Sequence, residues 1–108
     1  MANFGEVNVL SGSTLTLVRP PNAKYWNLQN QDTGPVVATF NGVTTGAVSP
    51  QILNGSSVSG GAGDWLDSID FPHEFASVTI TSATNPTAKV GSSWSRIPPI
   101  RINNTKLL

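Results

Sequence analysis

Residues 25–30 of this chain read Tyr-Trp-Asn-Leu-Gln-Asn, and residues 77–81 read Ser-Val-Thr-Ile-Thr. In both stretches apolar and polar side chains alternate, so that Trp26 and Leu28, for example, share one face of an extended segment. The second stretch is also rich in β-branched residues, which pack well on a pleated sheet. These two segments predict β-strands, and they point to an all-β fold class.

The same alternation extends outward along the chain in both directions. Short apolar runs near both ends have a period of two, and Gly, Ser, Asn, Asp and Pro separate the runs as turn formers. We therefore expect consecutive strands to pair as hairpins. Three such hairpins are predicted: residues 7–9 with 15–17, residues 25–30 with 35–40, and residues 77–81 with 88–90.

Other segments break the strand pattern. Pro20 and Pro21 should stop pairing, because proline offers no amide hydrogen to a ladder. Residues 43–63 are looser, and they predict a strand near 48–53 followed by a long loop. Residues 65–71 fit either a strand or a single helical turn, and the sequence leaves the two alternatives open. No stretch has the pattern of a confident helix.

The composition limits the classes of function. The chain has 108 residues, which suits one domain, and its six basic and six acidic residues give a net charge of zero. Because so few cations cannot create a strong positive field, we expect no nucleic-acid partner. Charged residues make up only 11% of the chain, so hydroxyl and amide groups must cover much of its surface. Such a surface suits contact with another protein, because its desolvation costs less than that of ions.

The chain contains no cysteine, which excludes a disulfide framework, a thiolate nucleophile and a cysteine-bound zinc site. The first residues lack the basic segment and apolar stretch of a secretory signal, and no run of 18 apolar residues occurs. We therefore expect a soluble protein that is made in the cytoplasm and has no membrane partner.

Few residues have the chemistry of a reactive site. The acidic residues Asp64, Asp67 and Asp70, with Glu74 beyond them, suggest either a calcium site or a solvated acidic loop, although their spacing is not that of an EF-hand. The only histidine, His73, adjoins Glu74, as in a general-base pair, but no serine lies in a nucleophile elbow. We therefore expect no catalytic residues, no cofactor and no enzymatic activity.

The aromatic residues suggest an alternative function. Trp26, Trp65 and Trp94 could form a platform on which sugar rings stack, with nearby amide and carboxylate side chains binding hydroxyl groups. Large aromatic side chains in a small β domain more often belong to the core. We expect at least two of the three to be mostly buried, and a carbohydrate-binding module stays open as the alternative.

Several segments between residues 19 and 94 follow one another in a recognisable order. They are a basic, proline-bearing segment at 19–21, the strand at 25–30, Val-Val-Ala-Thr-Phe-Asn-Gly at 36–42, Ile-Leu-Asn-Gly at 52–55, Trp65, and a last strand pair that ends near Trp94. In this pattern of strands and turns, residues 19–94 resemble a class of small phage virion proteins that decorate or cement capsids, or that serve as short head fibres. The resemblance covers most of the chain.

The resemblance implies a single antiparallel β-sandwich or jelly-roll-like barrel at residues 7–95. It also implies a homodimer or homotrimer that binds the major capsid protein on the outside of the virion, after synthesis in the host cytoplasm. A tail or connector component shares this fold class and stays open as well.

The two ends of the chain are expected to be extended arms, at residues 1–6 and 96–108. The C-terminal arm contains two adjacent prolines and is more apolar than a solvated tail needs to be. An extended arm of this kind can fill pockets in a partner. The residues predicted to bind the partner are Ile97, Ile100, Arg101, Ile102, Leu107 and Leu108.

Overall fold

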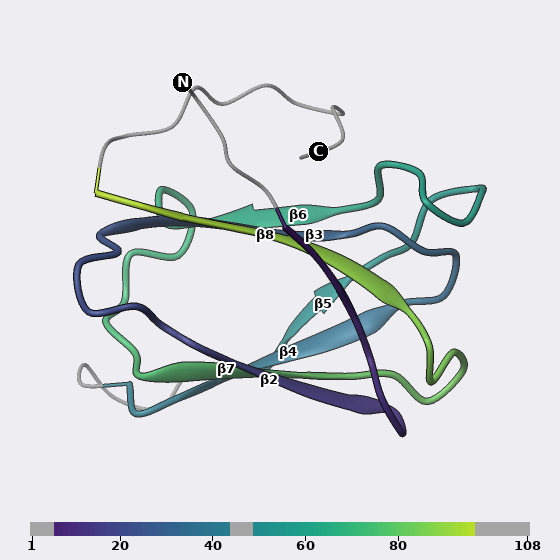
Figure 1. The fold of residues 1–108 in the computed structure, drawn as a ribbon, viewed down its shortest axis with the longest axis horizontal. Coiled ribbons are helices and arrows are strands. Elements are labelled where there is room, and N and C mark those ends of the chain that lie inside the picture. The colour runs from purple at the N-terminus through teal and green to yellow at the C-terminus, as the bar shows by residue number, and fades with distance from the viewer. Residues whose placement is uncertain (1–5, 44–48, 97–108) are drawn as a thin grey trace.

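The computed structural model describes residues 6–43 and 49–96, and these residues form eight strands and no helix. The strands build two four-stranded sheets that pack face to face (Figure 1). In chain order the strands are β1 (Glu6–Val9), β2 (Thr14–Val18), β3 (Tyr25–Asn30), β4 (Val36–Asn41), β5 (Gln51–Leu53), β6 (Trp65–Asp67), β7 (Ser77–Thr81) and β8 (Lys89–Ser95).

The strand order identifies the sandwich as a jelly roll. The first sheet has the order β1-β8-β3-β6 and the second has the order β2-β7-β4-β5, with every neighbouring pair antiparallel. Eight antiparallel strands in two such sheets are the jelly-roll architecture. The predicted fold class, a small antiparallel β-sandwich of the jelly-roll type, is confirmed.

The three predicted hairpins are wrong, although the predicted strands are present. β1 pairs with β8 and β2 pairs with β7, while β3 and β4 lie in different sheets. β7 and β8 are likewise in opposite sheets, and only β4 and β5 are both consecutive and paired. The turn formers between strands therefore carry the chain across the sandwich, about 10 Å from one sheet to the other, instead of folding it back within one sheet.

The inward faces of both sheets meet in an aromatic core. Trp26 is 1% exposed, and its ring lies 5.5 Å from Phe40, 6.0 Å from Phe71 and 5.3 Å from Phe75, measured between ring centroids. Phe40 and Phe71 stack at 4.2 Å. Because tilted, edge-on and stacked ring pairs are all favourable, these rings join the two sheets through Trp26 on β3 and Phe40 on β4.

Arg19 closes one end of this aromatic core. The chain leaves the ladder at the predicted prolines, since β2 ends at Val18 and the Ala23 amide donates to the Pro20 carbonyl at 3.1 Å. The Arg19 guanidinium lies 4.7 Å from the Phe75 ring centroid, and its Nε donates to the Ala23 carbonyl at 2.9 Å. The cation therefore covers the edge of the core while its polar atoms stay hydrogen-bonded.

The segments that the sequence left open are now placed. Residues 65–67 are the short strand β6, and a turn at 68–70 follows it, so the strand alternative holds for the first half of that segment only. Within residues 49–53, the described part of the predicted region 48–53, the strand is β5. The predicted arms, apart from Glu6 and Arg96, lie outside the described residues.

Candidate functional site

His73 and Glu74, the two adjacent residues that were considered as a general-base pair, both contact other side chains. Glu74 accepts a hydrogen bond from Arg19, with the Nη1 and Oε2 atoms 3.3 Å apart, and the glutamate side chain is 74% exposed. His73 packs edge-on against Phe71, with ring centroids 4.8 Å apart. These contacts anchor the segment between β6 and β7 to the aromatic core.

Two of the aspartates, Asp67 and Asp64, support separate pieces of backbone. Asp67 is 1% exposed, and its Oδ1 accepts the amides of Ile69 and Asp70, each at 3.0 Å, which shapes the turn after β6. Asp64 instead accepts two hydrogen bonds from Asn54. Across residues 6–43 and 49–96, no three acidic, histidine or cysteine side chains gather in a group that could hold a metal ion.

The tryptophans are divided between the core and a surface cleft. Trp26 is buried, and Trp94 is partly buried against the core, with its ring 6.4 Å from that of Phe75. Trp65 is partly buried and lines a cleft. The expectation that at least two of the three are mostly buried is confirmed. The predicted arm residues 97–108 lie outside the described residues.

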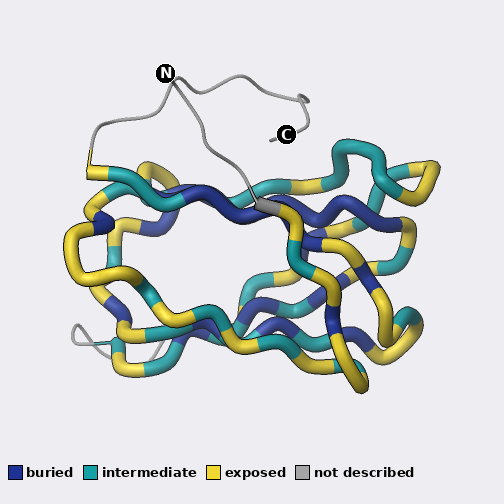
Figure 2. The backbone as a smooth tube through the Cα atoms, in the orientation of Figure 1, coloured by how far each residue is buried: buried dark blue, intermediate teal, exposed yellow. Residues whose placement is uncertain are grey.

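A regular uncharged surface covers the outside of the second sheet. We call it the hydroxyl face. In the sheet register its residues form cross-strand rows over β2, β7, β4 and β5. They occupy the positions that alternate with the more buried, inward-facing residues, and Figure 2 shows this alternation in burial along the backbone. Six of its ten side chains are hydroxyls and none is charged. The ten residues are Thr14, Thr16, Val18, Val37, Thr39, Asn41, Ile52, Ser77, Thr79 and Thr81.

Hydrogen bonds order the middle of the hydroxyl face. Asn41 donates its side-chain amide to the hydroxyl of Thr79 at 2.9 Å and to that of Ser77 at 3.2 Å. The hydroxyls of Thr16 and Thr79 lie 3.4 Å apart on adjacent strands. Because neighbouring strands hold these groups in register, the face presents fixed rows of donors and acceptors without an ion to desolvate.

The sequence contained a partial signal for this face. Thr-Leu-Thr at 14–16 and Thr-Ile-Thr at 79–81 show that hydroxyls share the outward side of their strands. The pairing of β2 with β7, which lies more than sixty residues away in the chain, is what brings them together. The predicted hairpins instead assign the two motifs to different pairs of strands.

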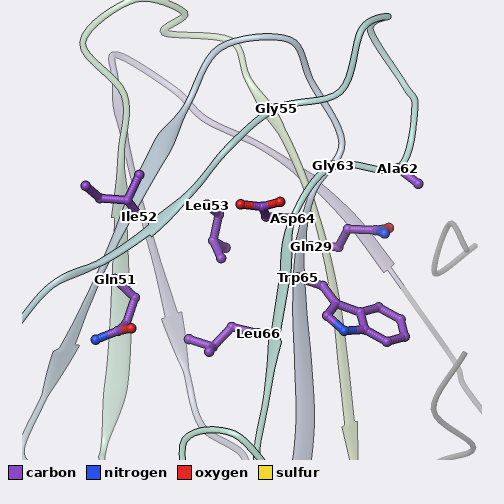
Figure 3. A pocket seen from close by; sticks show the side chains of 10 residues that line it. All are labelled: Gln29, Gln51, Ile52, Leu53, Gly55, Ala62, Gly63, Asp64, Trp65 and Leu66. Carbon is purple, nitrogen blue, oxygen red and sulfur yellow. The ribbon is translucent and has the colours of Figure 1, made fainter. Parts of the chain in front are cut away.

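A cleft of about 530 Å³ opens on one side of the sandwich. It lies between β6, an edge strand of the first sheet, and β5, an edge strand of the second. These two strands are not paired with each other. Figure 3 shows Leu53 and Leu66 between these strands, while Trp65 points to the opposite side of β6 from Leu66. The cleft thus has an apolar floor, and the ring of Trp65 lies on the other side of β6 from that floor.

Two glycines allow the chain to close around this cleft. A Cβ atom at Gly55 would overlap the carbonyl oxygens of Asp32 and Thr33, and one at Gly63 would lie 2.5 Å from the carbonyl oxygen of Asn30. Backbone therefore packs directly on backbone at both positions. The loop between β5 and β6 is held against the end of β3 by this close approach.

None of the described residues belongs to a helix long and apolar enough to span a membrane. No family model matches the chain, and no curated protein or solved structure matches it either. The function must therefore be inferred from the fold, the hydroxyl face and the cleft.

Proposed function

We propose that this chain is a structural protein that binds the outside of a phage capsid and stabilises it, as the resemblance to decoration and cement proteins implies. The observation that carries the proposal is the hydroxyl face, which extends over all four strands of one sheet without a charged side chain. Protein surfaces that stay solvated usually contain both signs of charge. The centres of protein interfaces, in contrast, are depleted of charge.

The ends of the hydroxyl face add apolar contact area. Val18 is 73% exposed and Ile52 is 65% exposed, and they lie on the edge strands β2 and β5. A protein partner that binds the hydroxyl face would cover these exposed aliphatic side chains. Their burial would contribute about 25 cal/mol of binding free energy for each Å² of apolar surface removed from water. The partner in this proposal is the major capsid protein.

The fold and the chain ends are consistent with the same role. Jelly rolls occur in viral capsid proteins and in lectins, which is support by analogy of fold. The binding of Ile97, Ile100 and the other predicted arm residues to a neighbour stays a prediction. So does self-association as a dimer or trimer, which would multiply weak contacts over a shell.

The first test is the presence of the chain in virions. Particles purified from a culture that produces the phage should contain this chain at a constant ratio to the major capsid protein, as measured by quantitative mass spectrometry. Its absence from the particles, or its presence only in the soluble fraction, would contradict the proposal.

The second test places lysines on the hydroxyl face. The double variant Thr16→Lys/Thr39→Lys puts two cations into the row that includes Thr79. Because an unpaired cation buried in an interface is costly, we expect binding to capsids that lack the chain to weaken at least tenfold in a sedimentation assay.

The matched control for this test is Ser59→Lys. It also replaces a hydroxyl by a cation, but it changes an exposed loop residue away from the hydroxyl face. The control should bind capsids as the unchanged chain does. Equal binding by the double variant would show that the hydroxyl face is not the contact surface.

A further inference from the structure

Three of the four edge strands in the described residues are protected against pairing with another chain. β5 and β6 have three residues each, β6 ends on Asp67, and β1 begins with Glu6. Short edge strands and charged side chains are common means by which a sheet avoids edge-to-edge association. β2 has neither protection, because it has five residues, no charged side chain, no proline and an unbroken register with β7.

The backbone of β2 alternates between bonding to β7 and facing away from it. At the two ends of this ladder the Arg19 amide donates to the Ala76 carbonyl at 3.0 Å, and the Ser82 amide donates to the Ser13 carbonyl at 3.1 Å. Hydrogen-bonded pairs alternate along an antiparallel ladder. The odd-numbered residues of β2 therefore bond to β7, and the even-numbered residues direct their N–H and C=O groups to the outer edge.

This outer edge is open to water. In the described part of the chain, the outward backbone groups of Thr16 and Val18 have no hydrogen-bond partner. Thr14 also faces outward, where its amide makes a long contact of 3.5 Å with the Ser11 carbonyl. All three outward-facing residues are exposed, and Val18 is 73% exposed. An unpaired edge of this kind is a template for one more strand.

The residue pattern of β2 is the same in both chain directions. Thr-Leu-Thr-Leu-Val at 14–18 has a leucine on each side of Thr16 and a β-branched residue at each end. Leu15 and Leu17 pack against the core, but both are only partly buried. A second β2 that ran antiparallel about Thr16 would place each Leu15 opposite Leu17 of the other copy. The strand is therefore complementary to itself, which favours a second copy as the partner.

We infer that β2 pairs antiparallel with β2 of a second copy of this chain, about a two-fold axis at Thr16. In this register the two Thr16 residues exchange both backbone hydrogen bonds, and Val18 lies opposite Thr14. The leucine pairs lose exposed apolar surface, and β2 has no ion to desolvate. A register with its axis at Leu17 would instead place Arg19 opposite a leucine.

The dimer does not rest on the proposed capsid contact, although the two share a sheet. Pairing through β2 joins the second sheets of both copies, so their hydroxyl faces lie side by side. Dimerisation is measured on the purified chain without capsids. Thr39→Lys separates the two proposals, because Thr39 belongs to the hydroxyl face but lies on β4, away from the β2 edge. It should leave the dimer unchanged even where it weakens capsid binding.

The first experiment uses the absence of cysteine from the chain. Thr16→Cys places two thiols across the axis with Cα atoms about 5.5 Å apart, a distance that a disulfide can span. In a glutathione redox buffer this variant should form a covalent dimer on a non-reducing gel. Val18→Cys is the matched control, because it lies on the same exposed edge while its two copies are about 14 Å apart along the strands. It should crosslink at least about tenfold more slowly.

The second experiment blocks the edge and spares the ladder. Thr16→Pro removes an amide that points away from β7, so the sheet loses no hydrogen bond. Sedimentation equilibrium should show a monomer–dimer equilibrium for the unchanged chain, and the proline variant should raise its dissociation constant at least about tenfold. Thr16→Val keeps the amide and the β-branched shape, so it is the control and should dimerise as the unchanged chain does.

Three results would overturn the inference. One is an unchanged chain that stays monomeric up to about 1 mM, the weak end of specific association. The second is crosslinking of Thr16→Cys no faster than that of Val18→Cys, and the third is equal dimerisation of Thr16→Pro and Thr16→Val. Circular dichroism verifies that the proline variant is folded. If it is not, Thr16→Lys takes its place, because two cations that meet at the axis repel each other and should raise the dissociation constant likewise.

Discussion

At the scale of single residues, hydrogen bonding and close packing account for the polar groups that first suggested chemistry. Asp67 shapes a turn, Glu74 pairs with Arg19, and His73 lies against Phe71. A buried polar group is costly unless it is hydrogen-bonded, and Asp67, which is 1% exposed, meets this requirement. The contacts of Glu74 and His73 fasten the segment between β6 and β7 to the core.

The prediction at this scale concerns Gly55. In Gly55→Ala the new methyl group would meet the backbone carbonyls of Asp32 and Thr33, which cannot move without shifting the chain. We expect a loss of about 1–3 kcal/mol in the free energy of unfolding, measured by urea denaturation.

Gly34→Ala is the matched control for this prediction. Its methyl group would lie 2.6 Å from the Thr84 hydroxyl oxygen, which is the end of a side chain that can rotate away. This control should lose less than half as much stability as Gly55→Ala. An equal loss in the two variants would contradict the contact that we describe between Gly55 and the backbone.

At the scale of elements, the connection from β3 to β4 explains why hairpin reasoning failed. Asn30 is fully buried, and its Nδ2 donates to the carbonyls of Gly34 at 2.8 Å and Leu53 at 2.9 Å. Its Oδ1 accepts the amide of Asp32 at 2.9 Å. The Asn30 side chain therefore holds the segment that crosses from β3 to β4 and binds it to β5. The turn residues here form a corner between the sheets instead of a hairpin turn.

The prediction at this scale is that Asn30→Ala weakens the whole sandwich. It leaves the backbone groups of Gly34, Leu53 and Asp32 without their partner in a buried site, and each such loss costs about 1–3 kcal/mol. We expect the free energy of unfolding to fall by at least about 2 kcal/mol in urea denaturation. Hydrogen exchange of the Asp32 amide should also become faster.

Asn22→Ala serves as the control for the Asn30 variant. Asn22 is exposed, and its carbonyl, which accepts the Lys24 amide at 3.1 Å, is retained in the variant. Its stability should stay within about 0.5 kcal/mol of the unchanged chain. If Asn30→Ala behaved in the same way, the corner would be held by other contacts.

At the scale of the whole molecule, the jelly roll joins residues that are far apart in the chain. Glu6 of the first strand pairs with Ser92 of the last, and Thr14 pairs with Thr81. Because such pairings require large loops to close before they contribute stability, all-β folds of this kind form slowly.

The prediction at this scale concerns the folding rate. Refolding after dilution from urea should take milliseconds to seconds, and stopped-flow tryptophan fluorescence can follow it because Trp26 becomes buried in the core. Double-jump experiments serve as the control, because they verify that the observed refolding phase starts from a fully unfolded chain. Complete refolding within microseconds would be incompatible with the strand order described above.

The sequence was sufficient to predict most of the strands and the direction of their side chains, although it left β6 open between a strand and a helical turn. Trp26 and Leu28 point into the core, and the strand at residues 77–81 buries Val78 and Ile80, as a period of two requires. This part was accessible because alternation is a local property: each side chain follows the backbone direction of its own strand.

The choice of partner strands required the tertiary structure. The turn formers after Asn30 are compatible with a hairpin and with a corner, and the packing of one sheet on the other selects the corner. The hydroxyl face depends on that choice, as does the cleft beside Trp65, because each is assembled from strands that only the jelly-roll order brings together. Energies of contact between residues distant in the chain decide such an order, and local patterns do not contain them.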